Sequence, residues 1–439
     1  MALTSQTRTN EAIDTPPRGR GRSIALTTAA VVAGTAASLL RQPGPGALNT
    51  IWAEDGEIFL TQAVRDGAGA FTTSYAGYYH LVARIVAAVA AVLPAAWAGA
   101  VLAAGAALIT TVFAVAVYHL SGEYLSSNPP PTGRRLRRLT STLPRLVVSV
   151  PVAVLPMAQG DVLNSPANLH WTGLYLLFWL LVSRPATTAG RVLACAGIVL
   201  VTASDILTGV YVPLAAFVVW FHRDRYAWIK AAAFGVPFAV QVLGLLTGQS
   251  EREGLTPDPV LGVTGYVFRA VPAAFFGERW VGTKVSTVSL VFTALAVLLV
   301  VAVLLLAWLR RTTARWWFAL AAALHSAALY IAPVGLSGIA TPRYNVAPAL
   351  LLLVAVVSLV LPKYDARVLT ALSVLIAIVC VVNFRVVNPR SEGPAWDDGI
   401  DSGRVACVQS PGGTVSIELP PLAAPGWHAT LPCDYVDRN

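Results

Sequence analysis

The sequence predicts an all-α membrane protein that crosses a bilayer about eleven times, because a membrane helix needs only about 20 apolar residues. Of its 439 residues, 56% are apolar and 12% are charged, which is about half the charge of an ordinary soluble domain. The mean hydropathy of +0.65 agrees. This composition excludes a water-soluble enzyme, a disordered chain and a small disulfide scaffold.

The positive charge has a membrane explanation. The net charge is +9, and Lys and Arg concentrate in short polar segments between apolar runs. Such segments mark the cytoplasmic loops of membrane proteins. The charge therefore indicates orientation, and we expect a lipid bilayer and no nucleic acid among the partners. The basic segments are 121–143, 183–191, 222–230, 310–315 and 362–367.

Residues 1–23 are polar and rich in Pro and Gly, which predicts a disordered cytoplasmic N-terminus. The apolar run that follows lacks a small-residue cleavage site, so we interpret it as a retained anchor. Further apolar runs define a transmembrane domain over 24–383. The predicted spans are 24–41, 95–119, 144–158, 171–182, 192–203, 210–221, 229–247, 284–309, 316–333, 347–361 and 367–383.

Segment 78–93 decides the topology, because it is short, rich in Ala and carries His80 and Arg84. If it spans, the basic cluster at 134–138 falls outside the cell. If it lies flat as an interfacial helix, every basic loop lies inside. The flat placement leaves the N-terminus inside, the C-terminus outside, and a long first outer loop over 42–94 with interfacial helices. A second polar outer loop is expected over 248–283.

The tail, residues 384–439, is expected outside the cell as a small β-like segment. It holds Pro, Gly and short alternating stretches such as 414–419. In an oxidising compartment its two cysteines, Cys407 and Cys433, are expected to form a disulfide. So small a segment cannot bury much apolar core, and a disulfide would stabilise it.

Three carboxylates, Glu54, Asp55 and Glu57, follow the first span. Their mutual repulsion raises the pKa of at least one of them. A helix would put Glu54 and Glu57 on one face. A solvated loop or a helix first turn explains such acids equally well, but the apolar and aromatic neighbours favour a cluster held against the membrane.

Other outer polar residues each have a structural and a functional explanation. His170 begins a span, as an interfacial aromatic-belt residue does, or it binds substrate together with Asn168. Asp205 ends a short apolar run, where an acid needs a partner or water. Arg84 follows His80 by four residues and could neutralise the acidic cluster. Arg343 either extends toward the interface as an ordinary arginine does or clamps a lipid phosphate.

The long first loop with Glu54-Asp55 after the first span resembles the GT-C superfamily of integral-membrane glycosyltransferases. Segment 77–84 is similar to the second loop helix of that family, and Pro342-Arg343-Tyr344 looks like its Arg-Tyr step near a lipid phosphate. The resemblance covers about residues 20–383 and implies a GT-C-like fold. The composition, rich in alanine and poor in lysine, resembles that of actinobacterial proteins.

The resemblance and the outward-facing polar residues predict one function. Sugar nucleotides are made in the cytoplasm, so an outer site needs a polyprenyl-phosphate sugar as donor. The acceptor is a glycan or glycolipid of the cell envelope, and direct displacement inverts the sugar. Asp55 is the predicted general base. Glu54 orients it or shares a divalent cation with it, Mg²⁺, Mn²⁺ or Ca²⁺. Predicted substrate-binding residues are Glu57, His80, Arg84, Asn168, His170, Asp205, Arg343 and Tyr344.

Two other classes of protein stay open. A secondary transporter or lipid flippase would place charges or broken helices at mid-membrane, and only Asp205 comes close to that. A non-catalytic partner of an envelope-synthesis complex is the third possibility. Convergence of Glu54, Asp55, Arg343 and Asp205 on one outward cavity would favour the glycosyltransferase.

Overall fold

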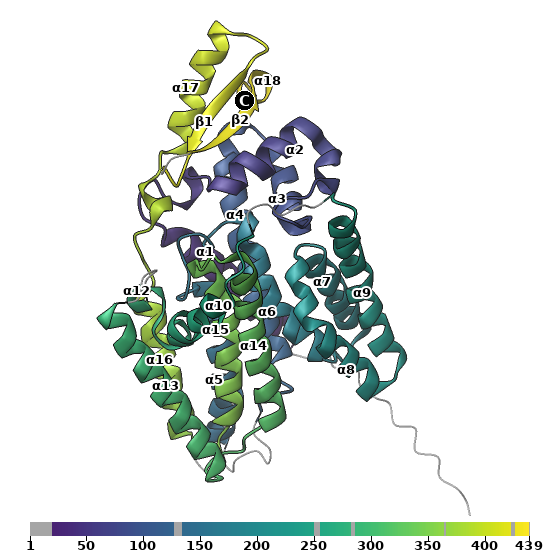
Figure 1. Ribbon diagram of the computed structural model, residues 1–439, viewed down its shortest axis with the longest axis vertical. Coiled ribbons are helices and arrows are strands. Elements are labelled where there is room, and N and C mark those ends of the chain that lie inside the picture. The colour runs from purple at the N-terminus through teal and green to yellow at the C-terminus, as the bar shows by residue number, and fades with distance from the viewer. Residues whose placement is uncertain are drawn as a thin grey trace, which may run out of the picture.

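The computed structural model describes residues 20–126, 134–249, 255–281, 286–363, 366–422 and 426–438. A long bundle of helices carries a small layer at one end, where the C-terminal tail packs on the first loop (Figure 1). Most of the predicted disordered N-terminus lies outside the described residues, as do the side chains of the basic cluster at 134–138.

The bundle helices coincide with the apolar runs. Helix α15 lies at the centre, because all of its residues are buried, whereas α13 keeps many apolar side chains exposed, as a lipid-facing helix does. The bundle consists of α1 (Arg20–Leu40), α4 (Ala98–Leu120), α5 (Arg134–Val154), α6 (Leu169–Val182), α7 (Thr188–Thr202), α8 (Val212–His222), α9 (Arg225–Leu246), α13 (Thr287–Trp308), α14 (Trp316–Ser337), α15 (Val346–Leu359) and α16 (Arg367–Val382).

The chain is a multi-pass membrane protein. Within the described residues, 6 helical segments are long and apolar enough to cross a bilayer, and several further apolar helices are shorter. The predicted number of about eleven spans therefore stays a prediction.

The basic loops gather at one end of the bundle. The Tyr124 hydroxyl donates to the carbonyl of Val182, and the Lys230 ammonium donates to the carbonyl of Ser183 at 3.1 Å. The Arg315 guanidinium reaches the carbonyl of Ser126. We call this end, with the loops around 121–126, 183–187, 222–225, 310–315 and 360–363, the basic end. The opposite end, which carries the tail, is the capped end.

Helix α3 (Leu81–Ala91) is too short to cross the bilayer. Its 11 residues extend over about 16 Å, against a hydrocarbon core of about 30 Å. Both of its ends attach to the capped end, since Leu81 N donates to the carbonyl of Ala203 and the Tyr435 hydroxyl donates to that of Ala90. This placement agrees with the flat interfacial segment that the charge pattern predicts.

The expectation of a polar loop over 248–283 is wrong for its central part. Residues 259–276 form one apolar helical segment of 18 residues, made of α10 (Pro259–Gly265), a π-helical turn and α11 (Val271–Phe276). Its start and its end both attach to the capped end, through Asp258 N to the carbonyl of Gly335 and Glu278 N to that of Pro156. The segment therefore adds no net pass between the two ends. Short α12 (Glu278–Val281) follows it.

The tail folds into α17 (Trp396–Gln409), an antiparallel pair of β1 (Thr414–Leu419) and β2 (Trp427–Pro432), and α18 (Cys433–Val436). The alternating pattern predicts β1 correctly, and the expected disulfide between Cys407 and Cys433 is present. Helix α17 was not predicted. Alternate residues of β1 are buried in a core that the tail shares with the first loop and α2 (Thr61–Asp66).

We expect cysteine labelling to separate the two ends. A cysteine at exposed Arg311 represents the basic end, and one at exposed Ser416 of β1 represents the capped end. Because basic loops stay in the cytoplasm, a membrane-impermeant maleimide should label Ser416→Cys but not Arg311→Cys in intact cells. Labelling of both variants after lysis is the control. Labelling of Arg311→Cys alone in intact cells would place the capped end inside.

Candidate functional site

A cavity of about 70 Å³ lies at the capped end. Four separate segments form it: the first loop, the turn before α6, the turn that leads into α8, and the turn that leads into α15. The lining residues are Glu54, Tyr75, Ala76, Tyr78, His80, Ala167, Asn168, His170, Trp171, Leu207, Arg343 and Tyr344. Six of the predicted site residues are among them, and Asp55, Glu57, Arg84 and Asp205 are not.

A π-helical turn over Asp55–Leu60 separates the two neighbouring acids. The amide of Thr61 donates to the carbonyl of Gly56, five residues earlier, which is the wide spacing of a π-helix. Such wide turns are rare and are common at functional sites. In this turn the Glu54 side chain lines the cavity, whereas Asp55 is only 1% exposed. The sequence predicts that Asp55 is the general base and that Glu54 supports it. In the structure Glu54 lines the cavity, and Asp55 is buried away from it.

Glu54 and Arg343 form the charged pair of the cavity. Their Oε1 and Nη1 atoms are 3.4 Å apart, and the side chains are 13% and 29% exposed. Arg343 lies in the short turn Pro342–Asn345 that leads into central helix α15, so a rigid element positions it. Asp161 lies close enough that Arg343 lowers its pKa, although burial has the larger effect and raises that pKa.

Asp55 stabilises the part of the cavity wall that the turn before α6 forms. Its Oδ1 accepts from the amide of Ala167 at 2.7 Å, and Ala167 lines the cavity beside Asn168. Burial raises the pKa of Asp55 to about 7, against the opposing charge of Arg390. Arg390 comes from the tail, is itself buried, and donates to the carbonyl of Asn164 at 3.1 Å. Asp55 and Arg390 thus hold the turn before α6 in place.

Two histidines form an aromatic wall. His80 stacks on Tyr78 with ring centroids 4.1 Å apart, and its centroid is 5.5 Å from that of His170. Burial lowers the pKa of His80 well below its usual value, so this imidazole is neutral at physiological pH. His80 also has a left-handed backbone with φ of 49°, a conformation that costs energy in a residue other than glycine and that concentrates at functional sites.

Several buried polar atoms of the cavity wall have no hydrogen-bond partner among the residues that the structure describes. They are Glu54 Oε2, His80 Nε2, His170 Nε2 and Trp171 Nε1. His170 Nδ1 lies 2.8 Å from the carbonyl of Ala167, so Nδ1 carries the proton and Nε2 is left as an acceptor. Buried polar atoms are nearly always paired in native proteins. These four atoms offer hydrogen-bonding positions, both donors and acceptors, to a polar ligand or to ordered water in the cavity.

Three predicted site residues have structural contacts instead. Glu57 Oε2 accepts from the amide of His428 in β2 at 2.9 Å. Arg84 donates to Gln62 at 2.9 Å and lies over the ring of Phe59, so it does not neutralise the acidic pair. Asp205 accepts from the amide of Leu207 at 2.7 Å and caps a turn. It reaches the cavity only indirectly, with Oδ2 4.0 Å from His170 Nε2.

The tail packs directly on the acidic turn. Ala53 N donates to the carbonyl of Pro420 at 3.0 Å. A methyl group added to Gly56 would lie 2.5 Å from Leu419 Cδ1, so the Leu419 side chain packs directly against Gly56. Together with the Glu57 contact, the tail holds the acidic turn from the side opposite the cavity.

Sequence reasoning missed Tyr75 and Arg390 as parts of the site. The three tyrosines between positions 75 and 79 were a usable signal, although tyrosines are also enriched at membrane interfaces. Arg390 offered no signal, because nothing in its neighbourhood distinguishes it from other arginines. Among the described residues, no group of three or more His, Cys, Asp or Glu side chains could hold a metal ion, and Glu54 and Asp55 face different surroundings.

No protein-family model matches this chain, and no curated protein matches it. Comparison with solved structures finds similarity to a cryo-EM structure of a mutant of arabinofuranosyltransferase AftD from mycobacteria. The identity is 13% and the TM-score is 0.38, over 89% of this chain and 30% of that one. The chain thus spans less than a third of that structure, and a similarity at this level carries no argument. The function is argued from the site alone.

The raised pKa of Asp55 predicts a pH-dependent stability. A carboxyl with an ordinary unfolded pKa near 4 and a folded pKa of about 7 binds a proton more tightly in the folded state. Its stabilising contribution is complete below about pH 4 and is lost as the pH rises through about 7. The melting temperature of purified wild-type protein should therefore fall between pH 6 and pH 8. Asp55→Asn keeps the acceptor for Ala167 and should lose this component, and an unchanged pH profile would contradict the burial argument.

The contact between Gly56 and Leu419 predicts a non-additive pair of substitutions. Gly56→Ala overpacks the contact with Leu419, whose side chain is only 1% exposed and has no room to move. This overpacking should lower the free energy of unfolding by about 1–3 kcal/mol. Leu419→Ala leaves a cavity at a cost of about 2–5 kcal/mol. In the double variant the new methyl group occupies part of that cavity, so the combined loss should be smaller than the sum. Strict additivity in denaturation experiments would mean that the tail does not press on the acidic turn.

Proposed function

We propose that the protein is a membrane glycosyltransferase that moves a sugar from a polyprenyl-phosphate donor to a cell-envelope acceptor on the extracytoplasmic side. The observation that carries the proposal is the Glu54–Arg343 pair in an aromatic cavity with unpaired polar atoms. The cavity lies at the end of the bundle away from the basic loops. A carboxylate and a guanidinium side by side are the two charges that transfer from a phosphate-linked donor requires.

Glu54 acts as the general base in this proposal. The hydroxyl oxygen of the acceptor attacks the anomeric carbon of the donor sugar, the hydroxyl proton passes to the Glu54 carboxylate, and the bond from the anomeric carbon to the phosphate oxygen breaks. The attack comes from the face opposite the leaving group, so the configuration inverts. General-base catalysis of this kind contributes about 10²- to 10⁴-fold. Asp55, predicted from the sequence as the base, becomes a positioning residue because it is buried beneath the wall.

Arg343 receives the negative charge of the departing polyprenyl phosphate. A guanidinium pairs with phosphate through two parallel hydrogen bonds, and positive charge placed where negative charge develops lowers the barrier. Arg343 is held by Glu54 before substrate binds. We propose that the donor phosphate takes over part of this contact and frees the Glu54 carboxylate for the acceptor. A divalent cation in this role remains an alternative that metal addition would test.

The aromatic wall is proposed to bind the sugar. Trp171 and Tyr344 lie edge to face with ring centroids 5.0 Å apart, and Tyr78 stacks on His80. Neutral imidazole nitrogens and the Trp171 indole N–H suit hydroxyl groups, which both donate and accept. Asn168 lines the same wall and adds an amide. The transporter alternative is less well supported, because the charged pair of Glu54 and Arg343 lies at one end of the bundle.

Glu54→Gln should reduce transfer by about 10²- to 10⁴-fold, because the amide keeps the shape and cannot accept the proton. The measurement is product formation by reconstituted protein supplied with polyprenyl-phosphate sugars and envelope lipids. Donor affinity should change little, since Arg343 remains. Arg343→Gln should weaken donor binding as well as slow transfer.

Glu57→Gln is the matched control. It removes the same charge three residues away, and its amide oxygen still accepts from the His428 amide, so transfer should stay close to wild type. Near-normal transfer by Glu54→Gln would exclude Glu54 as the base. If Asp55→Asn alone abolished transfer in a folded protein, the base would be Asp55, as the sequence predicts. If no wild-type preparation formed a product with any polyprenyl-phosphate sugar, the glycosyltransferase proposal would fail.

A further inference from the structure

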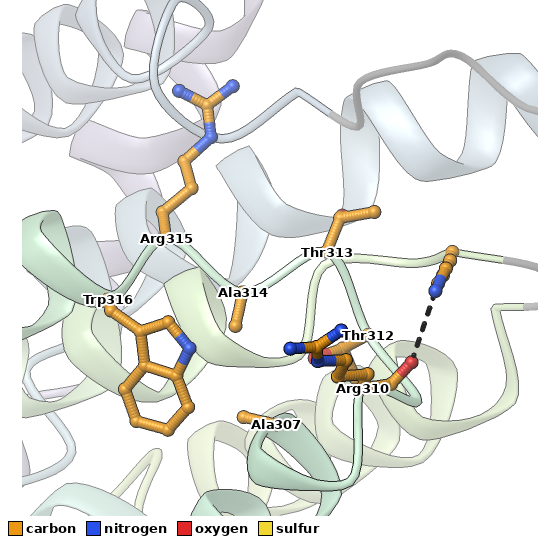
Figure 2. A pocket seen from close by; sticks show the side chains of 8 residues that line it. Ala307, Arg310, Thr312, Thr313, Ala314, Arg315 and Trp316 are labelled. Atoms are coloured by element: carbon orange, nitrogen blue, oxygen red, sulfur yellow. Dashed lines mark hydrogen bonds between the residues drawn. The ribbon is translucent and has the colours of Figure 1, made fainter.

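A second pocket, of about 570 Å³, lies at the basic end. It is formed by the end of α13, the connection to α14 and the segment after α15. Arg310, Arg315 and Lys363 line it together with Trp316 (Figure 2). The site argued above lies at the opposite end of the bundle and uses none of these residues.

The wall of this pocket is held by backbone hydrogen bonds. Thr313 N donates to the carbonyl of Leu361 at 2.9 Å, and Arg315 N donates to that of Ser358 at 3.0 Å. Thr312 and Pro362 form an antiparallel bridge. The connection is therefore a short paired ribbon and not a free loop, so it presents its cations from fixed positions.

The pocket is strongly cationic. Three of its eight lining residues carry a positive charge, and none of the eight is acidic. Lys363 donates to the carbonyl of Arg310 at 3.4 Å, the contact drawn in Figure 2. Arg315 donates to the carbonyl of Ser126. The acceptor of Arg315 is a neutral carbonyl, and among the described residues the exposed Arg310 side chain has no hydrogen bond or ion pair, so these two arginines keep their charge available to a ligand.

Tryptophans place the pocket at the level of lipid headgroups. Trp308 is 76% exposed and Trp317 is 85% exposed, while Trp316 is 43% exposed. Exposed tryptophans mark the interface between hydrocarbon and water in membrane proteins. Helix α13 ends and α14 begins here, so the rim lies where two membrane helices leave the hydrocarbon.

We infer that this pocket binds the headgroup of an anionic phospholipid of the cytoplasmic leaflet. The cations match a phosphate, the tryptophan surfaces match the glycerol and upper chain region, and basic pockets between membrane helices on this side suit such headgroups. The bound lipid joins α13, α14 and the end of α15 through one ligand. The inference does not depend on the reaction proposed for the opposite end.

The test is lipid binding by detergent-purified full-length protein, measured by native mass spectrometry during titration with phosphatidylglycerol or phosphatidylcholine. Wild type should retain phosphatidylglycerol preferentially. Each basic residue within reach of the bound headgroup should contribute about fivefold to the affinity for anionic lipid. The pair Arg310→Gln and Arg315→Gln should therefore lower phosphatidylglycerol affinity by more than about tenfold and leave phosphatidylcholine binding unchanged.

The matched control is Arg223→Gln with Arg225→Gln. These two arginines are exposed at the same end and do not line the pocket, so phosphatidylglycerol binding should persist. Competition by soluble glycerol 3-phosphate separates a lipid from a free anion, and a lipid site should resist it. If the double variant does not fold, Arg310→Gln alone should still show about a fivefold loss. Equal binding of the two lipids by wild type, an equal loss in the control pair, or displacement by glycerol 3-phosphate would overturn the inference.

Discussion

The contact between Glu54 and Arg343 joins two parts of the chain that are 289 residues apart. Arg343 is positioned by the central helix of the bundle, and Glu54 by a turn of the first loop that has little stability of its own. A partly buried carboxylate left without its partner would cost several kcal/mol. The pair therefore requires that the first loop lie flat across the end of the bundle, and the other walls of the cavity follow from that placement.

Other features of the capped end also lower the stability of the folded protein. Asp55 is buried where a carboxylate is disfavoured, His80 has a strained backbone, and several polar atoms are unpaired. Proteins place such features at functional sites and compensate for them elsewhere. Here the compensation comes from the tail, whose apolar strand face and disulfide enlarge the core behind the acidic turn. The tail is thus part of the site's support although it does not line the cavity.

Much of the fold could be predicted because long apolar runs leave few alternatives to a membrane helix. The basic loops, the short interfacial α3 and the cysteine pair follow from similarly direct constraints. The segment 259–276 was missed because its polar flanks make the whole region look like a loop. Helix α17 was missed because Asp and Gly in its sequence oppose helix formation, and only its packing against β1 and the first loop overrides them.

The sequence predicted several of the residues that form the site, but it did not predict how their side chains are arranged. Glu54 and Arg343 do meet. Nothing in the sequence, however, shows that a π-helical turn directs Glu54 toward the cavity and its neighbour away from it. Glu57 was expected in the site because it belongs to the acidic cluster, and Arg84 because it follows His80 by four residues. Their side chains contact β2 and Phe59 instead. The direction of a side chain in a loop depends on tertiary contacts that become visible only in the folded chain.

The contact of the tail with the acidic turn also fixes when the site can form. The turn is synthesised early, whereas Pro420 and His428, which hold it, are made much later, His428 following Glu57 by 371 residues. A chain emerging from the ribosome therefore has its helices long before it has a finished cavity. Contacts between distant parts of a chain form late, so the cavity is complete only when the tail has folded onto the acidic turn. A chain cut short before β2 would leave the acidic turn unsupported.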